Sequence, residues 1–292
     1  MLALRILEIV FPLFAIVGAG YLYGRLKRPD MTFANQLNMD VFVPALLFGV
    51  LAGKDFDPGA YGPLALGGFA VVLGSGLLAL PVARLLGYAP RTFVPPMMFS
   101  NSGNMGLPLA VFAFGEQALP AAVVLFIIEN GLHFTLGTWI MDHRAHWLAV
   151  LRMPIVVATL AGIAFSLTGL TLPPVLAVPI DMLGQVCIPL LLFALGVRLI
   201  DVDLTHWRTG LVGAVVCPAT GLAVALAVRP LLHLPPLQEA QLLLFGALPP
   251  AVLNYIVAER YRQEPAKVAS IVMLGNLGAF VTIPAVLAFV LP

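Results

Sequence analysis

The residues of this sequence that could do chemistry begin with the stretch FSNSGNMGLPLA, residues 99–110. Two asparagines, Asn101 and Asn104, stand there among serines and glycines, and Pro108 follows. Asparagine amides supply hydrogen-bond donors without the desolvation cost of a buried cation. Because glycine and proline interrupt helices, the stretch predicts a helix break with a polar site at the break.

A second stretch, FGALPPAVLNYI at residues 245–256, has the same character. Pro249 and Pro250 are adjacent, and Asn254 and Tyr255 follow them. Each proline lacks a backbone donor and clashes with the preceding helical turn. The start of a half-helix has free N–H groups and partial positive charge, which suit an anion. We therefore expect substrate-binding residues in both stretches, although two simple helix kinks would be the alternative.

Ionisable and amide side chains also occur within apolar sequence. Glu129, Asn130 and His133 lie within residues 117–141, and Asn276 lies in the last apolar segment. An ionisable residue inside a membrane is costly and is functional by default. Glu129 is a candidate for a transported or coupling proton, and His133 could share that proton. An interhelical hydrogen bond is the alternative, and Asn130 and Asn276 are expected to line the same cavity.

Two further polar residues, Asp40 and Gln185, flank the prolines of two similar apolar segments. Asp40 is a candidate for coordinating a cation or contacting a neighbouring helix. The sequence has no motif for nucleotide binding, nucleophilic catalysis or metal ligation. We therefore expect no enzyme activity, no metal and no cofactor, with coupling to H⁺ or Na⁺ left open.

The composition places these residues in a membrane protein. Of 292 residues, 61% are hydrophobic and 10% are charged, whereas soluble domains average about 25% charged residues. The net charge of +1 argues against a nucleic-acid partner. The expected partners are the lipid bilayer and a small-molecule substrate.

A membrane-spanning helix needs about 20 mostly apolar residues. The sequence predicts ten such spans and an all-α polytopic protein. Their expected bounds are 3–24, 31–52, 62–87, 92–114, 117–141, 147–168, 173–199, 207–229, 237–259 and 266–291.

The positive charges predict the orientation of these spans. Twelve of the fifteen Lys and Arg residues fall on the side of the odd-numbered loops. Since cytoplasmic loops carry the excess of Lys and Arg, both termini are expected outside the cytoplasm. In a bacterium this means the inner membrane, with periplasmic termini.

An internal repeat relates the two halves of the chain. Val41 to Phe48 matches Val186 to Phe193 at an offset of 145 residues, including a shared proline, and Asn130 matches Asn276 at 146. Five spans per half is an odd number, so the second half enters the membrane in the opposite sense. The sequence thus predicts inverted repeats at residues 1–145 and 146–292, a construction that many secondary transporters use.

Three segments resemble the auxin efflux carrier family, which includes plant auxin exporters and bacterial organic-acid carriers. They are NSGNMGLPL at 101–109, NMDVFVPALLF at 38–48 and LPPAVLNYIVAERY at 248–261. The resemblance implies a fold similar to bile-acid sodium symporters, with broken spans 4 and 9 crossing each other. Asn101 and Pro108 would then lie at one crossover position, and the region of Pro249 and Pro250 at the other.

The same resemblance implies two domains, one of which moves. Spans 1, 2, 6 and 7 would form a scaffold domain, and spans 3–5 and 8–10 a transport domain that moves like an elevator. A homodimer through the scaffold helices is a family-level expectation.

These observations favour a secondary transporter of small organic anions such as malonate, malate or an auxin-like acid. A channel-like uniporter of the same fold is one alternative. A membrane sensor or enzyme with a transporter-like fold is the other, although no catalytic constellation or soluble output domain supports it.

Overall fold

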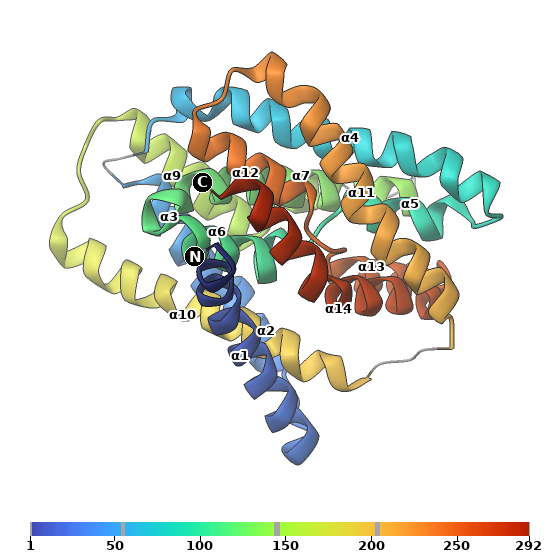
Figure 1. Ribbon diagram of the computed structural model, residues 1–292. Helices are drawn as coiled ribbons and strands as arrows, with labels where there is room; N and C mark the ends of the chain where they lie inside the picture. The colour runs from blue at the N-terminus through green and yellow to red at the C-terminus, as the bar shows by residue number, and fades with distance from the viewer. Residues whose placement is uncertain (1, 54–55, 143–146, 202–204, 292) are drawn as a thin grey trace.

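All named elements in the computed structural model are helices, and the structure describes residues 2–53, 56–142, 147–201 and 205–291 (Figure 1). The predicted boundary between the two halves, at residues 145 and 146, lies outside the described residues. Seven helical stretches of the described chain are long and apolar enough to cross a bilayer. They are α1 (Leu2–Lys27); α2 (Thr32–Leu37) with η1 (Asn38–Phe42) and α3 (Val43–Leu51); η2 (Pro58–Tyr61) with α4 (Gly62–Leu85); η4 (Glu116–Ala118) with α7 (Leu119–Leu132), η5 (His133–Gly137) and α8 (Thr138–Met141); α10 (Pro174–Arg198); α11 (Trp207–Leu232); and α14 (Pro265–Val290).

Three of the ten predicted spans are shorter in the structure than the sequence analysis expected. Two of them are the predicted broken helices, and the third begins with a 3₁₀ turn. Their helices are α5 (Pro90–Met98), η3 (Ser102–Gly106) and α6 (Leu107–Phe114); η6 (Trp147–Arg152) and α9 (Pro154–Leu167); and α12 (Pro236–Gly246) and α13 (Leu253–Arg260). Proline stands at the start of α5, α9 and α12, where its missing N–H costs nothing.

The long helices expose apolar side chains, which fits a lipid environment. Leu26, Leu85 and Val175 are each more than four-fifths exposed. In water such a surface would be an aggregation hazard, whereas in a bilayer it is the expected surface. The chain is therefore a polytopic membrane protein.

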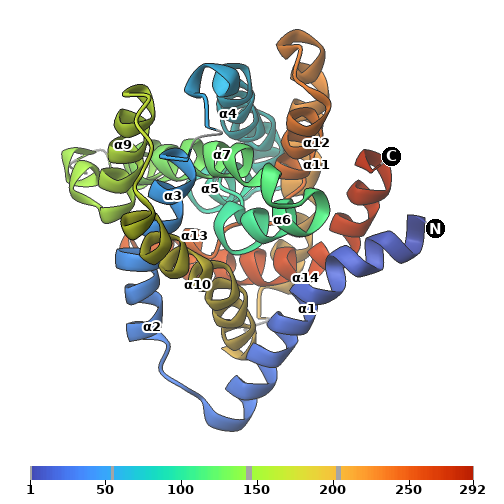
Figure 2. The same cartoon turned by 90° about the vertical axis from the view of Figure 1, so that its left-hand side faces the viewer.

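The helices pack in two groups. In the first group, α1 lies along α10, and α3 packs on α9 and α10. In the second group, α11 packs on α4, α5, α12 and α14, and α4 packs on α7. In both views of the molecule α9 and α3 lie to the left of α11 (Figures 1 and 2).

Small residues allow close approach within each group. A Cβ added at Gly20 of α1 would lie 2.2 Å from the carbonyl oxygen of Phe193 in α10, and one at Gly196 of α10 would lie 2.0 Å from that of Val17. A Cβ at Gly221 of α11 would lie 2.1 Å from the carbonyl oxygen of Gly246 in α12. Such contacts are typical of helix packing in membranes, where apolar burial alone gives little attraction.

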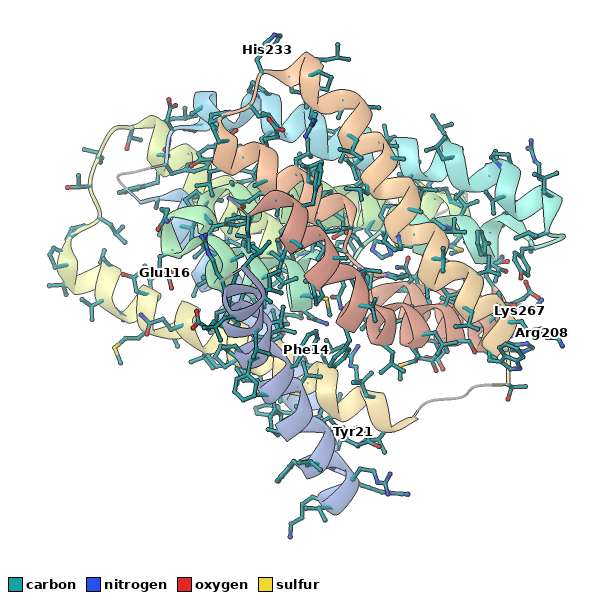
Figure 3. The ribbon with its side chains drawn as sticks, in the orientation of Figure 1. Phe14, Tyr21, Glu116, Arg208, His233 and Lys267 are labelled. Carbon is teal, nitrogen blue, oxygen red and sulfur yellow. The ribbon has the colours of Figure 1, made fainter. Side chains whose placement is uncertain are left out.

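The charged ends of α11 and α14 lie together. Figure 3 shows Arg208 and Lys267 together at the right of the view, near the start of α11, and His233, which caps the other end of α11, at the top. Beside them, the Thr92 hydroxyl donates a 2.7 Å hydrogen bond to Glu264, and Glu264 also pairs with Lys267. The start of α5 is thereby tied to the start of α14.

Candidate functional site

The two broken helices cross where their breaks meet. The backbone N–H of Asn101 donates to the carbonyl oxygen of Pro249 at 2.7 Å, and that of Ala251 donates to Phe99 at 2.9 Å. These bonds flank an antiparallel bridge between Ser100 and Pro250. Backbone that leaves the helix at membrane depth must find partners inside the protein, and here each break supplies partners for the other.

Proline explains why the second break suits this pairing. Neither Pro249 nor Pro250 has an N–H to satisfy, but both keep a carbonyl acceptor. Pro250 is the bridge residue of the second break, but the two backbone hydrogen bonds are made by the residues on either side of it. Pro249 accepts one of them and Ala251 donates the other. The sequence-predicted breaks are thus present at both stretches.

Three asparagine side chains form further hydrogen bonds around the crossing of the two breaks. Asn101 Nδ2 donates to Asn276 Oδ1 at 2.8 Å, and Asn276 Nδ2 donates to the Pro250 carbonyl at 3.0 Å. Asn254 Nδ2 donates to the Phe99 carbonyl at 2.8 Å. All three residues are at most 3% exposed. Because a buried amide without partners is costly, these bonds fix the relative position of α14, α13 and the first break.

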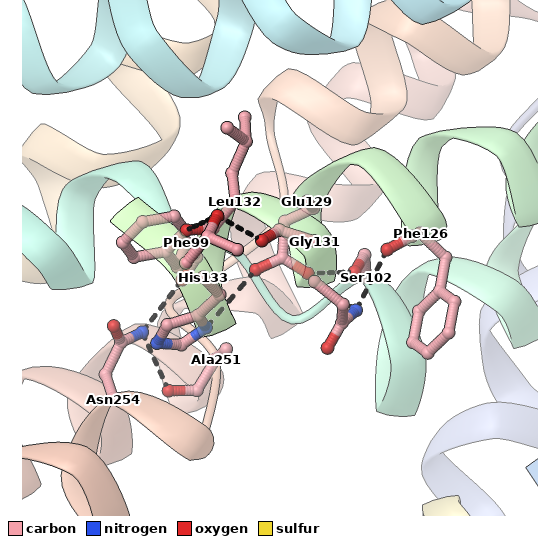
Figure 4. Close-up of polar contacts among 11 residues, drawn as sticks. Phe99, Ser102, Phe126, Glu129, Gly131, Leu132, His133, Ala251 and Asn254 are labelled. Carbon is pink, nitrogen blue, oxygen red and sulfur yellow. Dashed lines mark hydrogen bonds and ion pairs between the residues drawn. The ribbon is translucent and has the colours of Figure 1, made fainter. Parts of the chain in front are cut away.

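A polar cluster around Glu129 lies beside the first break (Figure 4). Glu129 Oε2 accepts hydrogen bonds from Ser102 Oγ at 2.6 Å and from Asn130 Nδ2 at 3.0 Å. Glu129 Oε1 lies 3.6 Å from His133 Nδ1, and neither of these two atoms has a hydrogen-bond partner in the described structure. Glu129 and His133 are 2% and 1% exposed. The His133 ring stacks on Phe99, with ring centroids 4.1 Å apart.

A cavity of about 370 Å³ opens at this crossing, which lies within the range of about 300–1,000 Å³ for small-molecule sites. One wall is formed by residues 35–43 and by the last two turns of α10. The other lining residues come mainly from the first break, from the residues around Glu129 and from the start of α13. The polar or charged residues on these walls are Asn35, Gln36, Asn38, Ser100, Asn101, Asn104, Glu129, Asn130, His133 and Arg198.

Three π-helical turns border the cavity. They are η1, η3 and η5, and each contributes two lining residues: Asn38 and Met39, Gly103 and Asn104, and His133 and Phe134. In η3 the wide turn shows directly, because the N–H of Gly106 donates to the carbonyl of Asn101 five residues earlier. Such turns are rare and occur frequently at functional sites.

All seven asparagines of the sequence belong to this site. Five line the cavity, and the other two, Asn254 and Asn276, hold its wall through the hydrogen bonds described above. The Asn104 side chain makes no hydrogen bond with the described residues and is partly exposed to the cavity. It is therefore available to a ligand, whereas Asn101 is engaged by Asn276.

The structure brings some of the predicted site residues together and leaves others apart. Asn101, Asn104, Glu129, Asn130 and His133 line the cavity. The remaining predicted residues do not line it: Pro108, Pro249, Pro250, Asn254, Asn276, Tyr255, Asp40 and Gln185. Pro108 is buried in the first turn of α6, Asp40 is exposed on η1, and Gln185 lines a separate groove with Asp181. The expectation that Asn276 faces the cavity is replaced by its bonded position behind the wall.

Tyr255 lines a second cavity, of about 590 Å³, on the other side of α13. Its hydroxyl donates to Glu259 at 2.9 Å. Val252, Ile256 and Arg198 line both cavities, so the two spaces adjoin at these residues.

Sequence reasoning missed several lining residues. Asn35, Gln36 and Asn38 precede the apolar part of their span, and Arg198 ends its span, where it was counted as a loop charge. Asn38 is 2% exposed, and its side-chain oxygen has no partner in the described chain. A signal was present, because Asn35 and Asn38 are three residues apart and share a helical face. Among the described residues no group of three His, Cys, Asp or Glu side chains could hold a metal ion.

Comparison with known proteins finds similarity to membrane transport proteins. The family described as "Membrane transport protein" matches residues 143–287. A protein of Rhizobium meliloti (strain 1021) named "Putative malonate transporter" is 29% identical, with 67% of each chain covered. The chain is therefore similar to membrane transport proteins over residues 143–287, and to a protein named as a malonate transporter over two thirds of its length.

Proposed function

We propose that the protein is a secondary transporter that binds a small carboxylate in the crossing cavity. The observation that carries the proposal is the gathering of all seven asparagines at one cavity. Amides are costly in a membrane, so their concentration at one place is explained best by a polar ligand. The name of the Rhizobium meliloti relative supports a carboxylate such as malonate.

The cavity offers donors suited to a carboxylate. Gly103 and Asn104 lie in the first turn of the half-helix that begins at Ser102, and Leu253 begins α13. All three line the cavity. The N–H groups of a first helical turn lack intrahelical partners and carry partial positive charge. Two half-helix starts and the free Asn104 amide would together hold one carboxylate group.

The proposal includes an inverted repeat and an elevator-like movement. The group of α1, α3, α9 and α10 would be the scaffold domain, and the group around α11 the transport domain. Packing within each group and a cavity lined by both support this division. Movement of one group along the other would carry the cavity across the membrane, as in alternating access.

Orientation and location follow from the basic residues. Arg208 and Lys267 mark the proposed cytoplasmic end, opposite His233 (Figure 3). Arg198 and Met153 lie at helix ends beside basic loops and line the cavity, which supports a cavity open toward the cytoplasm. We place the protein in the bacterial inner membrane with both termini periplasmic.

Glu129 is proposed as the coupling residue. Its Oε1 and His133 Nδ1 are both buried, unpartnered and 3.6 Å apart, so one proton added at this pair would join them. Protonation would also weaken the bonds that Ser102 and Asn130 donate to the carboxylate, and Ser102 belongs to the first break. Proton uptake would thereby act on the wall that holds the substrate.

Uptake into liposomes tests the proposal. Purified protein is reconstituted, and entry of radiolabelled malonate is measured with and without an imposed pH gradient. We expect gradient-dependent accumulation, a loss of at least about tenfold in Asn104→Ala, and unchanged uptake in Gln263→Ala, an amide outside both cavities. Glu129→Gln should keep malonate binding but lose the pH dependence.

Uptake that merely equilibrates malonate, independent of any gradient, would instead identify a channel-like facilitator. Failure to bind or move any carboxylate would contradict the proposal as a whole.

A further inference from the structure

Arg198 is a cation beside the proposed binding site that has no hydrogen-bond or ion-pair partner among the residues that the structure describes. Its side chain lines both cavities at the point where they adjoin. No hydrogen bond or ion pair joins it to any residue that the structure describes, and it is only partly exposed. A charge held away from bulk water and left unpaired is costly, so such a position is expected to receive an anion.

The local sequence directs Arg198 into this space. Leu191, Ala194, Leu195 and Arg198 follow the i, i+3, i+4, i+7 spacing, which places them on one face of α10. All four line the first cavity. This face of α10 is about 10 Å long at a rise of about 1.5 Å per residue, and it is apolar except for the guanidinium at its end.

The other charged groups that line the two cavities each lie beside another polar group of the described chain. Glu129 accepts from Ser102 and Asn130, and His133 lies against its remaining oxygen. Glu259, which lines the second cavity with Arg198, accepts from the Tyr255 hydroxyl. No ion pair links Glu259 to Arg198 within the described chain. The guanidinium is therefore the group with unused donors.

We propose that Arg198 binds a second carboxylate of the substrate, so that the site selects dicarboxylates over monocarboxylates. This inference rests on the proposed function, in which one carboxylate occupies the Asn104 side of the cavity. A guanidinium binds a carboxylate with two parallel hydrogen bonds, which a lysine ammonium cannot reproduce.

Binding of two acids to the purified protein tests this assignment. The probes are malonate and acetate at neutral pH, and the variants are Arg198→Gln, Arg198→Lys, Glu259→Gln and the control Arg208→Gln. Arg208 lines neither cavity and stacks on Trp207. We expect Arg198→Gln to weaken malonate about tenfold or more while acetate binding stays unchanged. Arg198→Lys should recover part of the loss, and Arg208→Gln should behave as the unaltered protein.

Each other result has a defined meaning. A malonate-to-acetate preference that survives in Arg198→Gln, or an equal loss for both acids, would overturn the assignment but leave the carboxylate site intact. Equal losses in Arg198→Gln and Glu259→Gln would identify a charge pair between helices and would also overturn it. If the unaltered protein binds neither acid, the proposed function fails together with this inference.

Discussion

The two helix breaks occupy matching spans but present different chemistry to the cavity. The first break lines it with Ser100, Asn101, Gly103 and Asn104. The second break lines it with the apolar residues Ala251, Val252 and Leu253. One break therefore offers side-chain amides, and the other offers a half-helix start with apolar side chains.

The hydrogen bonds explain this difference. The second break is used mainly through its backbone: the carbonyls of Pro249 and Pro250 accept from Asn101 and Asn276, and the Ala251 N–H donates to Phe99. We infer that the first break recognises the substrate through its side chains, whereas the second break supports the first through its backbone. The following experiments test that division.

The largest effect is expected from Asn276→Ala, which removes a support residue. The change leaves the Asn101 amide and the Pro250 carbonyl without their buried partner. We expect a loss of about 2–4 kcal/mol in the free energy of unfolding. Thermal unfolding of the detergent-solubilised protein measures it, and Asn104→Ala is the matched control, expected within about 0.5 kcal/mol of the unaltered protein. Equal destabilisation by the two variants would contradict the division of tasks.

A smaller effect is expected from Gly275→Ala, which disturbs the second break by crowding. The new Cβ would lie 2.5 Å from Pro250 Cδ, so the proline ring must shift. Overpacking of this kind costs about 1–3 kcal/mol. Gly278→Ala, one turn later in α14, meets nothing closer than 3.7 Å and should instead raise the unfolding temperature slightly. Equal unfolding temperatures of Gly275→Ala and Gly278→Ala would contradict the supporting role of the second break.

The smallest effect is expected where α5 meets α14, away from both breaks. Hydrogen bonds from Lys267 and Thr92 lower the pKa of Glu264. A lowered folded-state pKa stabilises the protein above the unfolded-state pKa, and this contribution is lost as the pH falls through the folded-state pKa. Thr92→Val should therefore reduce stability at neutral pH by a few tenths of a kcal/mol and make acid unfolding less steep, because Glu264 is solvent-exposed. Unfolding temperatures measured across acidic pH report both changes, and an unchanged pH profile would show that the Thr92 bond contributes nothing.

Much of the fold follows from local sequence. Seven predicted spans are long apolar helices, because length and composition determine which segments can cross a bilayer. Both helix breaks were predicted, because Pro249 and Pro250 remove donors whatever their surroundings. The close approach of Glu129 and His133 follows from their i, i+4 spacing on one helix.

The tertiary partners could not be predicted in this way. Nothing in the sequence near Asn276 shows that it bonds Pro250 instead of facing the cavity, since that depends on how α14 packs against the second break. Arg198 stands at the end of the expected span 173–199, where the sequence gives no sign of a binding site, although its helical face lines the cavity. Sequence periodicity indicates which residues share a helical face, but the partners of that face depend on how the helices pack.

The three π-helical turns have a consequence for the phase of the helices around the cavity. A π turn holds an additional residue, and each residue of an α-helix advances the side chains by about 100°. Removing one residue from Ser102–Gly106 would make the first turn of this half-helix a regular α-helical turn, and Asn104 would rotate relative to α6, away from the space it now lines. The Asn104 amide reaches the cavity because of the π turn. An insertion or deletion in this turn would therefore alter substrate recognition although the segment stays helical.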